Sequence, residues 1–364
     1  MSAERSLLTV ASGIEAELFS SLRSGKVQCT ACARRCQIGE GQIGLCGIRG
    51  VVNGKLYLLN YGRIITGHID PIEKKPVIHY RPGSKIFSIA TTGCNWLCGY
   101  CQNSEISQRR KIDGVEATPE MVVDLASKYG CEGLAYTYNE PSIFIEYARD
   151  VGRLAREKGI FNVFVSNGYE TPEAVGVMSE FLDCLTVDFK GSGETGFVRR
   201  YIGIPNADPI FQTLLEVKNR TKIHVEITDL IVPGLGDDLE SARKLCRWIY
   251  DNLGPETPIH FLRFHPDYKL MEIPITPVKT LEKHYEIAKK QGLIYSYIGN
   301  VPGHRAENTY CPSCRKVLVE RNSYEIGEYN LDDKSRCRFC GHRTPIVGPL
   351  SRSAREFRFI PVIN

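Results

Sequence analysis

The sequence predicts an α/β protein built on a parallel sheet, with a small cysteine-rich module at each end of the chain. Two observations predict this architecture. Between residues 85 and 300, short apolar runs alternate with longer amphipathic runs, and most of the 14 cysteines fall into three tight groups. Alternating strands and helices predict a parallel sheet with right-handed crossovers.

The alternating elements can be placed along the chain. The expected strands are residues 85–91, 133–138, 162–167, 184–189, 223–232, 259–264 and 294–299. The expected helices are residues 121–130, 142–159, 172–182, 208–220, 238–254 and 278–292. Six or seven such units predict a full or partial (β/α) barrel, with functional residues at the carboxyl ends of its strands. A doubly wound open sheet is the alternative.

The flanking segments differ from this repeat, so we expect three regions: residues 1–84, 85–300 and 301–364. Residues 1–28 are predicted to be helical, residues 29–50 form a glycine- and cysteine-rich loop module, and residues 55–69 alternate like a hairpin. Residues 301–364 contain a third cysteine group and a tail.

Composition narrows the class of protein. The chain has 364 residues, 42% of them apolar, and a formal net charge of +4. These values are near the globular norm and give only weak support for nucleic-acid binding. The amino-terminal segment lacks the pattern of a secretory signal, and no run reaches the ~18 apolar residues of a membrane span. A soluble cytoplasmic protein is therefore expected.

The central cysteine group, "GCNWLCGYC", has only three cysteines: Cys94, Cys98 and Cys101. They directly follow the first expected strand of the barrel. Cysteine thiolates hold 4Fe–4S clusters, normally four of them, so three would leave one iron without a protein ligand. An open position is typical of a catalytic metal rather than a structural one. A zinc site with a distant fourth ligand is the alternative.

This C-x3-C-x2-C spacing, with Tyr100 before the third cysteine, closely resembles the radical S-adenosylmethionine (SAM) enzymes. The resemblance implies a partial (β/α)6-type TIM barrel. It also implies that the open iron chelates SAM and that an external electron donor reduces the cluster. Reductive cleavage of SAM would give a 5′-deoxyadenosyl radical, which abstracts hydrogen from a substrate.

The same resemblance, extended to the glycyl-radical activating enzymes, implies cofactor contacts at the ends of the other strands. "TYNEP" places Asn139 and Glu140 where that family has a Gly-Gly-Glu-like element. The remaining implied cofactor contacts are Ser166, Asp188, Lys190, Glu226 and His265. Helix capping and solvated surface positions are the alternatives for these residues. No residue is singled out as catalytic.

The motifs "DPIEKKP", "GCNWLCGYCQN", "TYNEP", "VPGLGD", "RFHPDY" and "YIGN" occur in this order over nearly the whole chain. Together with the flanking cysteines, they look like the radical SAM member of the AmmeMemoRadiSam system, a family similar to pyruvate formate-lyase activating enzymes. That resemblance implies an AMMECR-domain protein and a Memo-like protein as partners.

The two outer cysteine groups each supply four ligands. Cys311, Cys314, Cys337 and Cys340 form two CxxC knuckles, which are typical of structural zinc in a ribbon. An auxiliary iron–sulfur cluster is the alternative there. The first group consists of Cys29, Cys32, Cys36 and Cys46. Its spacing is not that of a ferredoxin, so zinc and an auxiliary 4Fe–4S cluster remain open.

The sequence thus predicts a radical SAM enzyme that acts on a protein partner, as an activase or by another modification. One alternative is radical modification of RNA, with the carboxyl-terminal ribbon as the RNA reader. Another is a metal-binding module without catalysis. The three-cysteine group argues against the last, because a non-catalytic site has no reason to leave an iron open.

Overall fold

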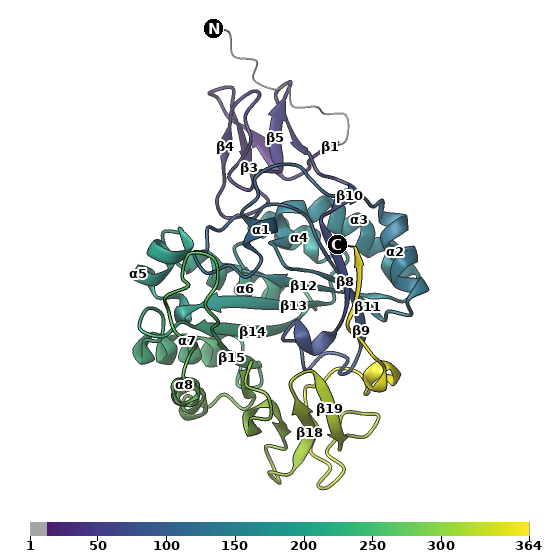
Figure 1. Ribbon diagram of the computed structural model, residues 1–364, viewed down its shortest axis with the longest axis vertical. Coiled ribbons are helices and arrows are strands. Elements are labelled where there is room, and N and C mark those ends of the chain that lie inside the picture. The colour runs from purple at the N-terminus through teal and green to yellow at the C-terminus, as the bar shows by residue number, and fades with distance from the viewer. Residues whose placement is uncertain (1–12, 364) are drawn as a thin grey trace.

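The computed structural model describes residues 13–363, and its centre is a nine-stranded sheet (Figure 1). Seven of these strands are parallel and lie in chain order. They are β9 (Lys85–Ala90), β11 (Gly133–Tyr136), β12 (Phe161–Ser166), β13 (Cys184–Lys190), β14 (His224–Ile231), β15 (Ile259–Arg263) and β16 (Ser296–Gly299).

Six helices connect the parallel strands. They are α2 (Pro119–Lys128), α3 (Ile145–Glu157), α4 (Pro172–Met178), α6 (Asp208–Arg220), α7 (Leu239–Asn252) and α8 (Val278–Lys290). Side-chain caps begin several of them: Thr118 accepts from Met121 N, and Asp238 accepts from Ser241 N. Such caps satisfy backbone donors that the first helical turn leaves free.

The consecutive strand order decides between the two architectures expected from the pattern. A doubly wound sheet reverses its strand order at a switch point. Here each parallel strand pairs with the one before it, without reversal, from β9 to β16. This is the winding of a partial (β/α) barrel, and it brings the carboxyl ends of all seven strands to one edge.

Segments from both ends of the chain extend this sheet. β8 (Thr66–Pro71) pairs antiparallel with β9, and β20 (Ile360–Ile363) pairs antiparallel with β8. The expected boundary between residues 84 and 85 therefore separates two strands that are hydrogen-bonded neighbours. β20, which ends at Ile363, consequently lies against the barrel rather than beside β18 and β19 (Figure 1).

The amino-terminal region is β-structure, which corrects the expected helix. Its strands are β1 (Ile14–Glu15), β2 (Phe19–Ser21), β3 (Val27–Cys29), β4 (Gln37–Ile38), β5 (Arg49–Val52) and β6 (Lys55–Leu58). Ala16 and Leu18 are buried, whereas Glu15 and Glu17 are exposed, so burial here follows a period of two residues. Residues 1–12 of the predicted helix lie outside the described residues.

The hairpin expected within residues 55–69 is also wrong. β6 instead pairs with the preceding β5 through a tight turn at Asn53 and Gly54, both with positive φ. Positive φ at both central positions is the geometry of a type I′ hairpin turn, which favours Asn-Gly. β7 (Arg63–Ile64) pairs with β10 (Val115–Glu116), and β8 joins the central sheet.

The carboxyl-terminal module is a small three-stranded sheet with its own core. It contains β17 (Thr309–Tyr310), β18 (Val317–Asn322) and β19 (Glu325–Tyr329). Its buried residues are Cys311, Leu318, Val319, Ile326, Leu331, Cys337 and Ile346. Among residues 13–363, no helix is long and apolar enough to cross a membrane.

One compact segment between β13 and α6 has no counterpart in the expected pattern. It contains η4 (Gly191–Gly193), α5 (Thr195–Phe197) and the π-helical turn η5 (Val198–Ile202). Its backbone carbonyls accept from the loop that carries the three cysteines: Leu97 N donates to Ile202 O, and Gly99 N donates to Tyr201 O, both over 2.9 Å. This segment therefore helps to fix the shape of that loop.

Candidate active site

A cavity of about 470 Å³ opens at the carboxyl edge of the central sheet. The side chains of Cys94, Cys98 and Cys101 all line it. The loop that carries them follows β9, as the sequence predicts. Six of the seven implied cofactor contacts line the same cavity: Asn139, Glu140, Ser166, Asp188, Lys190 and His265. Residues that the sequence places at separate strand ends are thus brought together.

The seventh residue, Glu226, lies elsewhere. It is the third residue of β14 and pairs in register with Thr186, near the amino-terminal edge of the sheet. Its carboxylate accepts from the backbone of Ile78 and His79 and contacts His260 over 2.8 Å. The implied cofactor contact of Glu226 is therefore corrected, because the strand begins only two residues before it. Leu230 is the β14 residue that lines the cavity.

The surroundings of the three sulfur atoms suit an iron–sulfur cluster better than one ion. Cys101 Sγ lies 3.1 Å from Ser107 Oγ, and Trp96 N donates to Cys94 Sγ over 3.5 Å. Unlike the carboxyl-terminal four, these three sulfurs do not all lie within 4.8 Å of one another. Each thiolate of a cubane binds its own iron, so wider spacing is expected there.

Burial keeps the thiols of Cys94 and Cys98 neutral in the absence of metal. It raises the pKa of Cys98 to about 12 and raises that of Cys94 as well. Metal binding requires the thiolate, so loading the site with metal would release protons.

Asn139 offers a free acceptor to the cavity. Its Nδ2 donates to Thr91 Oγ1 over 3.1 Å and to Gly93 O over 2.9 Å, which holds the side chain against the cysteine loop. Its Oδ1 is buried without a partner. A buried polar atom without a hydrogen bond costs free energy, so this oxygen marks a position for a ligand donor.

Glu140 organises the backbone at the end of β11. Its Oε1 accepts from Ser142 N and Ser166 Oγ, and its Oε2 accepts from Asn167 N over 2.8 Å. Burial raises the pKa of this carboxyl, whereas these hydrogen bonds oppose the rise. Glu140 therefore connects two strand ends as well as lining the cavity.

Asp188 and Lys190 form an ion pair at the end of β13, with Nζ and Oδ2 2.9 Å apart. Asp188 also accepts from the hydroxyl of Thr228 on the neighbouring strand. His265 is largely exposed at the edge of the cavity and contacts Asp267 over 3.2 Å. The Asp188–Lys190 pair is mostly buried, whereas the His265 side chain is exposed and accessible to a ligand.

Sequence reasoning missed several residues of this cavity. Lys75, from the "DPIEKKP" motif, donates to Asp70 Oδ2 over 2.7 Å and to Tyr138 OH over 3.4 Å. Burial lowers the pKa of Lys75 to about 8, against the opposing effect of Asp70. Arg263, the last residue of β15, also lines the cavity. Lys74, Lys75 and Arg263 therefore line the site in addition to Lys190, and only the end position of Arg263 on its strand could have indicated such a cation.

The carboxyl-terminal cysteine group has a different geometry. Among residues 13–363, the only group of possible metal ligands within 4.8 Å of one another is Cys311, Cys314, Cys337 and Cys340. The Sγ atoms of Cys311 and Cys340 are 3.6 Å apart, and those of Cys314 and Cys337 are 3.7 Å apart. Four thiolates around one ion at about 2.3 Å match this closeness.

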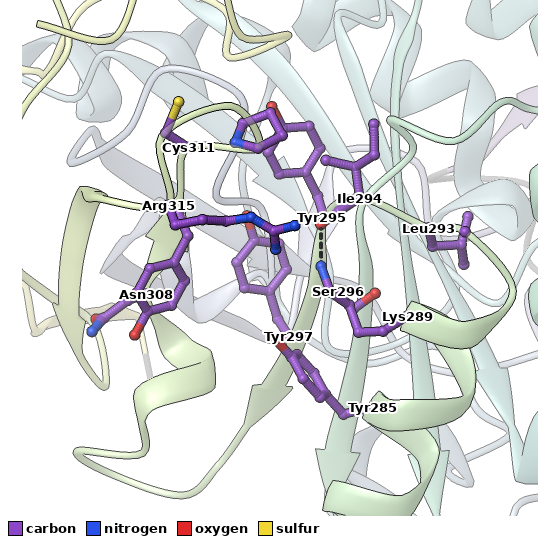
Figure 2. A pocket seen from close by; sticks show the side chains of 13 residues that line it. Tyr285, Lys289, Leu293, Ile294, Tyr295, Ser296, Tyr297, Asn308, Cys311 and Arg315 are labelled. Atoms are coloured by element: carbon purple, nitrogen blue, oxygen red, sulfur yellow. Dashed lines mark hydrogen bonds between the residues drawn. The ribbon is translucent and has the colours of Figure 1, made fainter. Parts of the chain in front are cut away.

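A second cavity, of about 420 Å³, lies between α8, β16 and this module (Figure 2). Cys311, Lys289 and Arg315 are among the residues that line it. None of the implied SAM contacts does. It is therefore separate from the cavity that holds Cys94, Cys98 and Cys101.

Comparisons with known proteins agree with the fold and the cysteine loop. The family model of the radical SAM superfamily matches residues 88–249. The uncharacterized protein MJ0808 of Methanocaldococcus jannaschii is 42% identical over 92% of this chain and 99% of its own length. The pyruvate formate-lyase-activating enzyme of Clostridium pasteurianum is 24% identical over 58% of this chain and 92% of its own.

Solved structures with a similar arrangement include a radical SAM methyltransferase from Sphaerobacter thermophilus. That structure is 14% identical, with a TM-score of 0.47 over 60% of this chain and 66% of that one. A domain of a pyruvate-formate lyase-activating enzyme from Bacteroides vulgatus is 17% identical, with a TM-score of 0.40 over 46% of this chain and 99% of that one.

The chain contains a radical SAM domain, residues 88–249, and is an enzyme of that class. Within it, the chain is similar to a pyruvate formate-lyase-activating enzyme. Membership implies a 4Fe–4S cluster and SAM as cofactors, and the lining of the cavity fits both.

Proposed function

We propose that this radical SAM enzyme abstracts a hydrogen atom from a protein partner. The observation that carries the choice of a protein is an apolar rim beside the cysteine loop, consisting of Leu97, Tyr268, Met271 and Ile275, which are 40–60% exposed. Lys269 N donates to Gly99 O over 2.8 Å, so the loop after β15 adjoins the cysteine loop. Exposed apolar residues that cluster around a site are typical of protein docking.

Cys94, Cys98 and Cys101 would hold the cluster. When bound, the cluster and SAM supply one-electron cleavage of the sulfonium and hence a 5′-deoxyadenosyl radical that abstracts hydrogen. The protein's part is to bind, orient and shield these groups.

The residues that line the cavity suit the two charged ends of a bound amino acid group. Asn139 Oδ1 would accept from the amino group, which satisfies its unpartnered oxygen. Lys190 and Arg263 would face the carboxylate, because cations stabilise a carboxylate in a partly buried site. Ser166 and Asp188 would hold these groups in place through Glu140 and Lys190, and His265 would contact the substrate at the mouth.

The similarity to an activating enzyme supports a protein substrate and an external electron donor. The order of the sequence motifs supports membership of the AmmeMemoRadiSam system, with an AMMECR-domain protein and a Memo-like protein as partners. In the carboxyl-terminal module, the close spacing of the sulfurs supports structural zinc.

The test is anaerobic. The protein is loaded with iron and sulfide, reduced and given SAM, and 5′-deoxyadenosine is measured with and without a candidate partner protein. We expect nucleoside from the parent chain and none from Cys101→Ala. Absence of nucleoside from a fully loaded protein in the presence of both partners, without any SAM binding to the cluster, would contradict the proposal.

A matched pair of substitutions tests the docking rim. Met271→Glu puts a charge on the rim, whereas Met121→Glu puts the same charge on α2, and both methionines are exposed. We expect Met271→Glu to weaken partner-dependent turnover by raising KM for the partner, with little change in partner-independent cleavage. Equal effects of the two variants would argue against the rim as a docking surface.

A further inference from the structure

The amino-terminal group of four cysteines lines a cavity that the site above does not explain. Cys29, Cys32, Cys36 and Cys46 all face this cavity, together with Arg34, Arg49 and Asn95. Three of the four cysteines are buried, and Cys36 is partly exposed. The loops between β3 and β5 therefore enclose a closed set of four sulfur ligands.

We propose that this cavity binds a second 4Fe–4S cluster, and that this cluster passes electrons to the one on Cys94, Cys98 and Cys101. The identity of the site rests on its own geometry. The electron-transfer role rests in addition on the proposed function above.

The spacing of the sulfurs distinguishes a cluster from zinc. Among residues 13–363, the carboxyl-terminal group alone has three or more ligand atoms within 4.8 Å of one another. The amino-terminal group does not, although its four thiols line one cavity. In its wider sulfur spacing, the amino-terminal group resembles Cys94, Cys98 and Cys101, the site of the family's cluster. Thiolates that each bind a separate iron stand farther apart than thiolates around one ion.

Two unpartnered donors point to a ligand in the cavity. Asn95 is 1% exposed, and its Nδ2 is buried without a hydrogen-bond partner. Arg34 Nη2 is likewise buried without a partner, although its Nε donates to the backbone oxygen of Asn95 over 2.8 Å. Both residues line the cavity. Sulfide and thiolate sulfurs of a cluster accept such hydrogen bonds, which also tune its potential.

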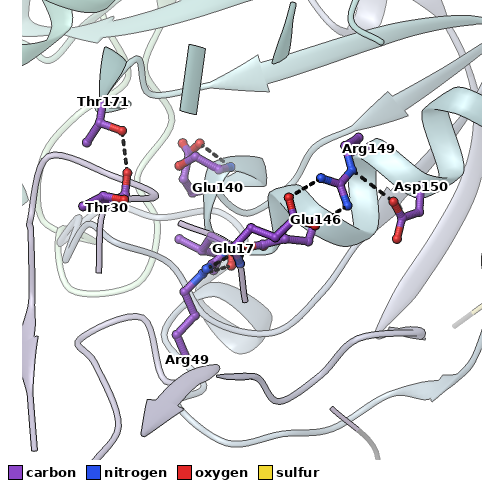
Figure 3. Close-up of polar contacts among 10 residues, drawn as sticks. Glu17, Thr30, Arg49, Glu140, Glu146, Arg149, Asp150 and Thr171 are labelled. Atoms are coloured by element: carbon purple, nitrogen blue, oxygen red, sulfur yellow. Dashed lines mark hydrogen bonds and ion pairs between the residues drawn. The ribbon is translucent and has the colours of Figure 1, made fainter. Parts of the chain in front are cut away.

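The site also holds positive charge that can offset the negative charge of its four thiolates. Arg34 makes no ion pair within the described part of the chain, so its positive charge can offset thiolates. Arg49 is buried and paired with Glu146 on α3, and its Nε donates to Ile143 O over 2.8 Å (Figure 3). This pair fixes one wall of the cavity against the barrel.

The module is attached beside the first cluster site. Thr171 donates to the backbone oxygen of Thr30 (Figure 3), and Ala33 N donates to Tyr169 O over 2.8 Å. A Cβ on Gly93 would lie 2.1 Å from Cys46 O, so the two cysteine loops are in backbone contact. Asn95 lines the amino-terminal cavity and lies with its Oδ1 3.7 Å from Cys94 Sγ. One residue therefore connects the two sites.

Four thiolates occupy all four irons of a cubane, so this cluster has no open iron for a substrate. Its position beside the first cluster site supports a role in electron transfer. An external low-potential flavin or iron–sulfur protein would reduce it by one electron. It would return to its oxidised state as the electron passes to the first cluster, which is reduced by the same one electron.

The deciding experiment removes the first cluster and leaves the second. The triple variant Cys94→Ala/Cys98→Ala/Cys101→Ala is purified anaerobically from cells supplied with both iron and zinc. We expect about four irons and about four sulfides per chain, with the EPR signal of a reduced 4Fe–4S cluster. A variant that keeps its fold but holds no iron and a second zinc would overturn the proposal.

A second variant removes a ligand of the amino-terminal site and leaves the three central cysteines in place. Cys36→Ala changes its most exposed ligand, and Cys131→Ala, a lone cysteine, is the control. We expect only Cys36→Ala to lose the second cluster. With dithionite it should still form 5′-deoxyadenosine, whereas with a protein electron donor it should not. Equal turnover with both reductants would contradict the electron-transfer role but leave the metal site and the proposed function intact.

Discussion

The two outer modules both supply four cysteines, yet they differ in sulfur spacing and in attachment. The carboxyl-terminal four converge on one point, with sulfurs 3.6 and 3.7 Å apart in two pairs, and the module has its own small core. The amino-terminal four surround a cavity, and their module packs against the barrel through one buried ion pair, Arg49–Glu146, and backbone contacts. The two groups therefore share a ligand number but differ in sulfur spacing, and the proposed difference in metal follows from that spacing.

The difference also concerns stability. Beyond its four cysteines, the carboxyl-terminal module has only a few buried apolar residues, so we expect a bound metal to supply much of its folding free energy. The amino-terminal module shares the main core of the molecule: Ile38, Ile48 and Val51 pack in the same cluster as the barrel residues. Removal of metal should therefore destabilise the amino-terminal module less than the carboxyl-terminal module.

The largest expected effect is on the stability of the carboxyl-terminal module. Cys314→Ala removes one ligand from the carboxyl-terminal site, where a structural zinc ion would contribute on the order of 10 kcal/mol. We expect β18 and β19 to lose their hydrogen-exchange protection while β12 in the barrel keeps its own. Unchanged protection of β18 and β19 would show that packing, rather than metal, holds this module.

A smaller effect is expected at the buried pair under the amino-terminal module. Arg49→Met leaves the Glu146 carboxylate buried without its partner, which costs about 3–5 kcal/mol. Replacing both residues, as Arg49→Met/Glu146→Leu, should recover most of that loss in denaturant unfolding. If the double variant is as unstable as the single one, the loss comes from the contacts of these two side chains rather than from an unpaired buried charge.

The smallest effect is expected at an exposed contact of the same module. Arg35 and Glu173 form a bidentate pair, but both side chains are about two-fifths exposed. Such pairs contribute about 1 kcal/mol or less. Arg35→Ala should therefore shift the unfolding midpoint only slightly and leave the iron content unchanged. A loss comparable to that of Arg49→Met would mean that the module is attached mainly through its surface.

Much of the barrel could be predicted from the sequence because its strands are short apolar runs and its helices are longer amphipathic runs. The helix at residues 208–220 has the predicted bounds, and the strand at 184–189 differs by one residue. Strand ends also brought Asn139, Asp188 and Lys190 to the cavity of the three cysteines. Here the periodicity of the sequence and the geometry of a parallel sheet lead to the same result.

The rest depends on contacts that periodicity does not encode. The segment around Leu18 was predicted to be helical, yet its strands form because Phe19 pairs with Cys29 and Ile14 with Leu58. Glu226 falls at the wrong edge of the sheet because a register of a few residues decides which end of a strand is reached. Lys75 enters the cavity from outside the barrel repeat, so no strand-end rule could have found it.

The most direct test of this account is the metal content of the parent chain, purified anaerobically with iron and zinc both available. Two clusters and one structural ion predict about eight irons, about eight sulfides and about one zinc per chain. About four irons and two zincs would contradict the distinction between the two outer modules. Absence of iron from all three sites would contradict the account as a whole.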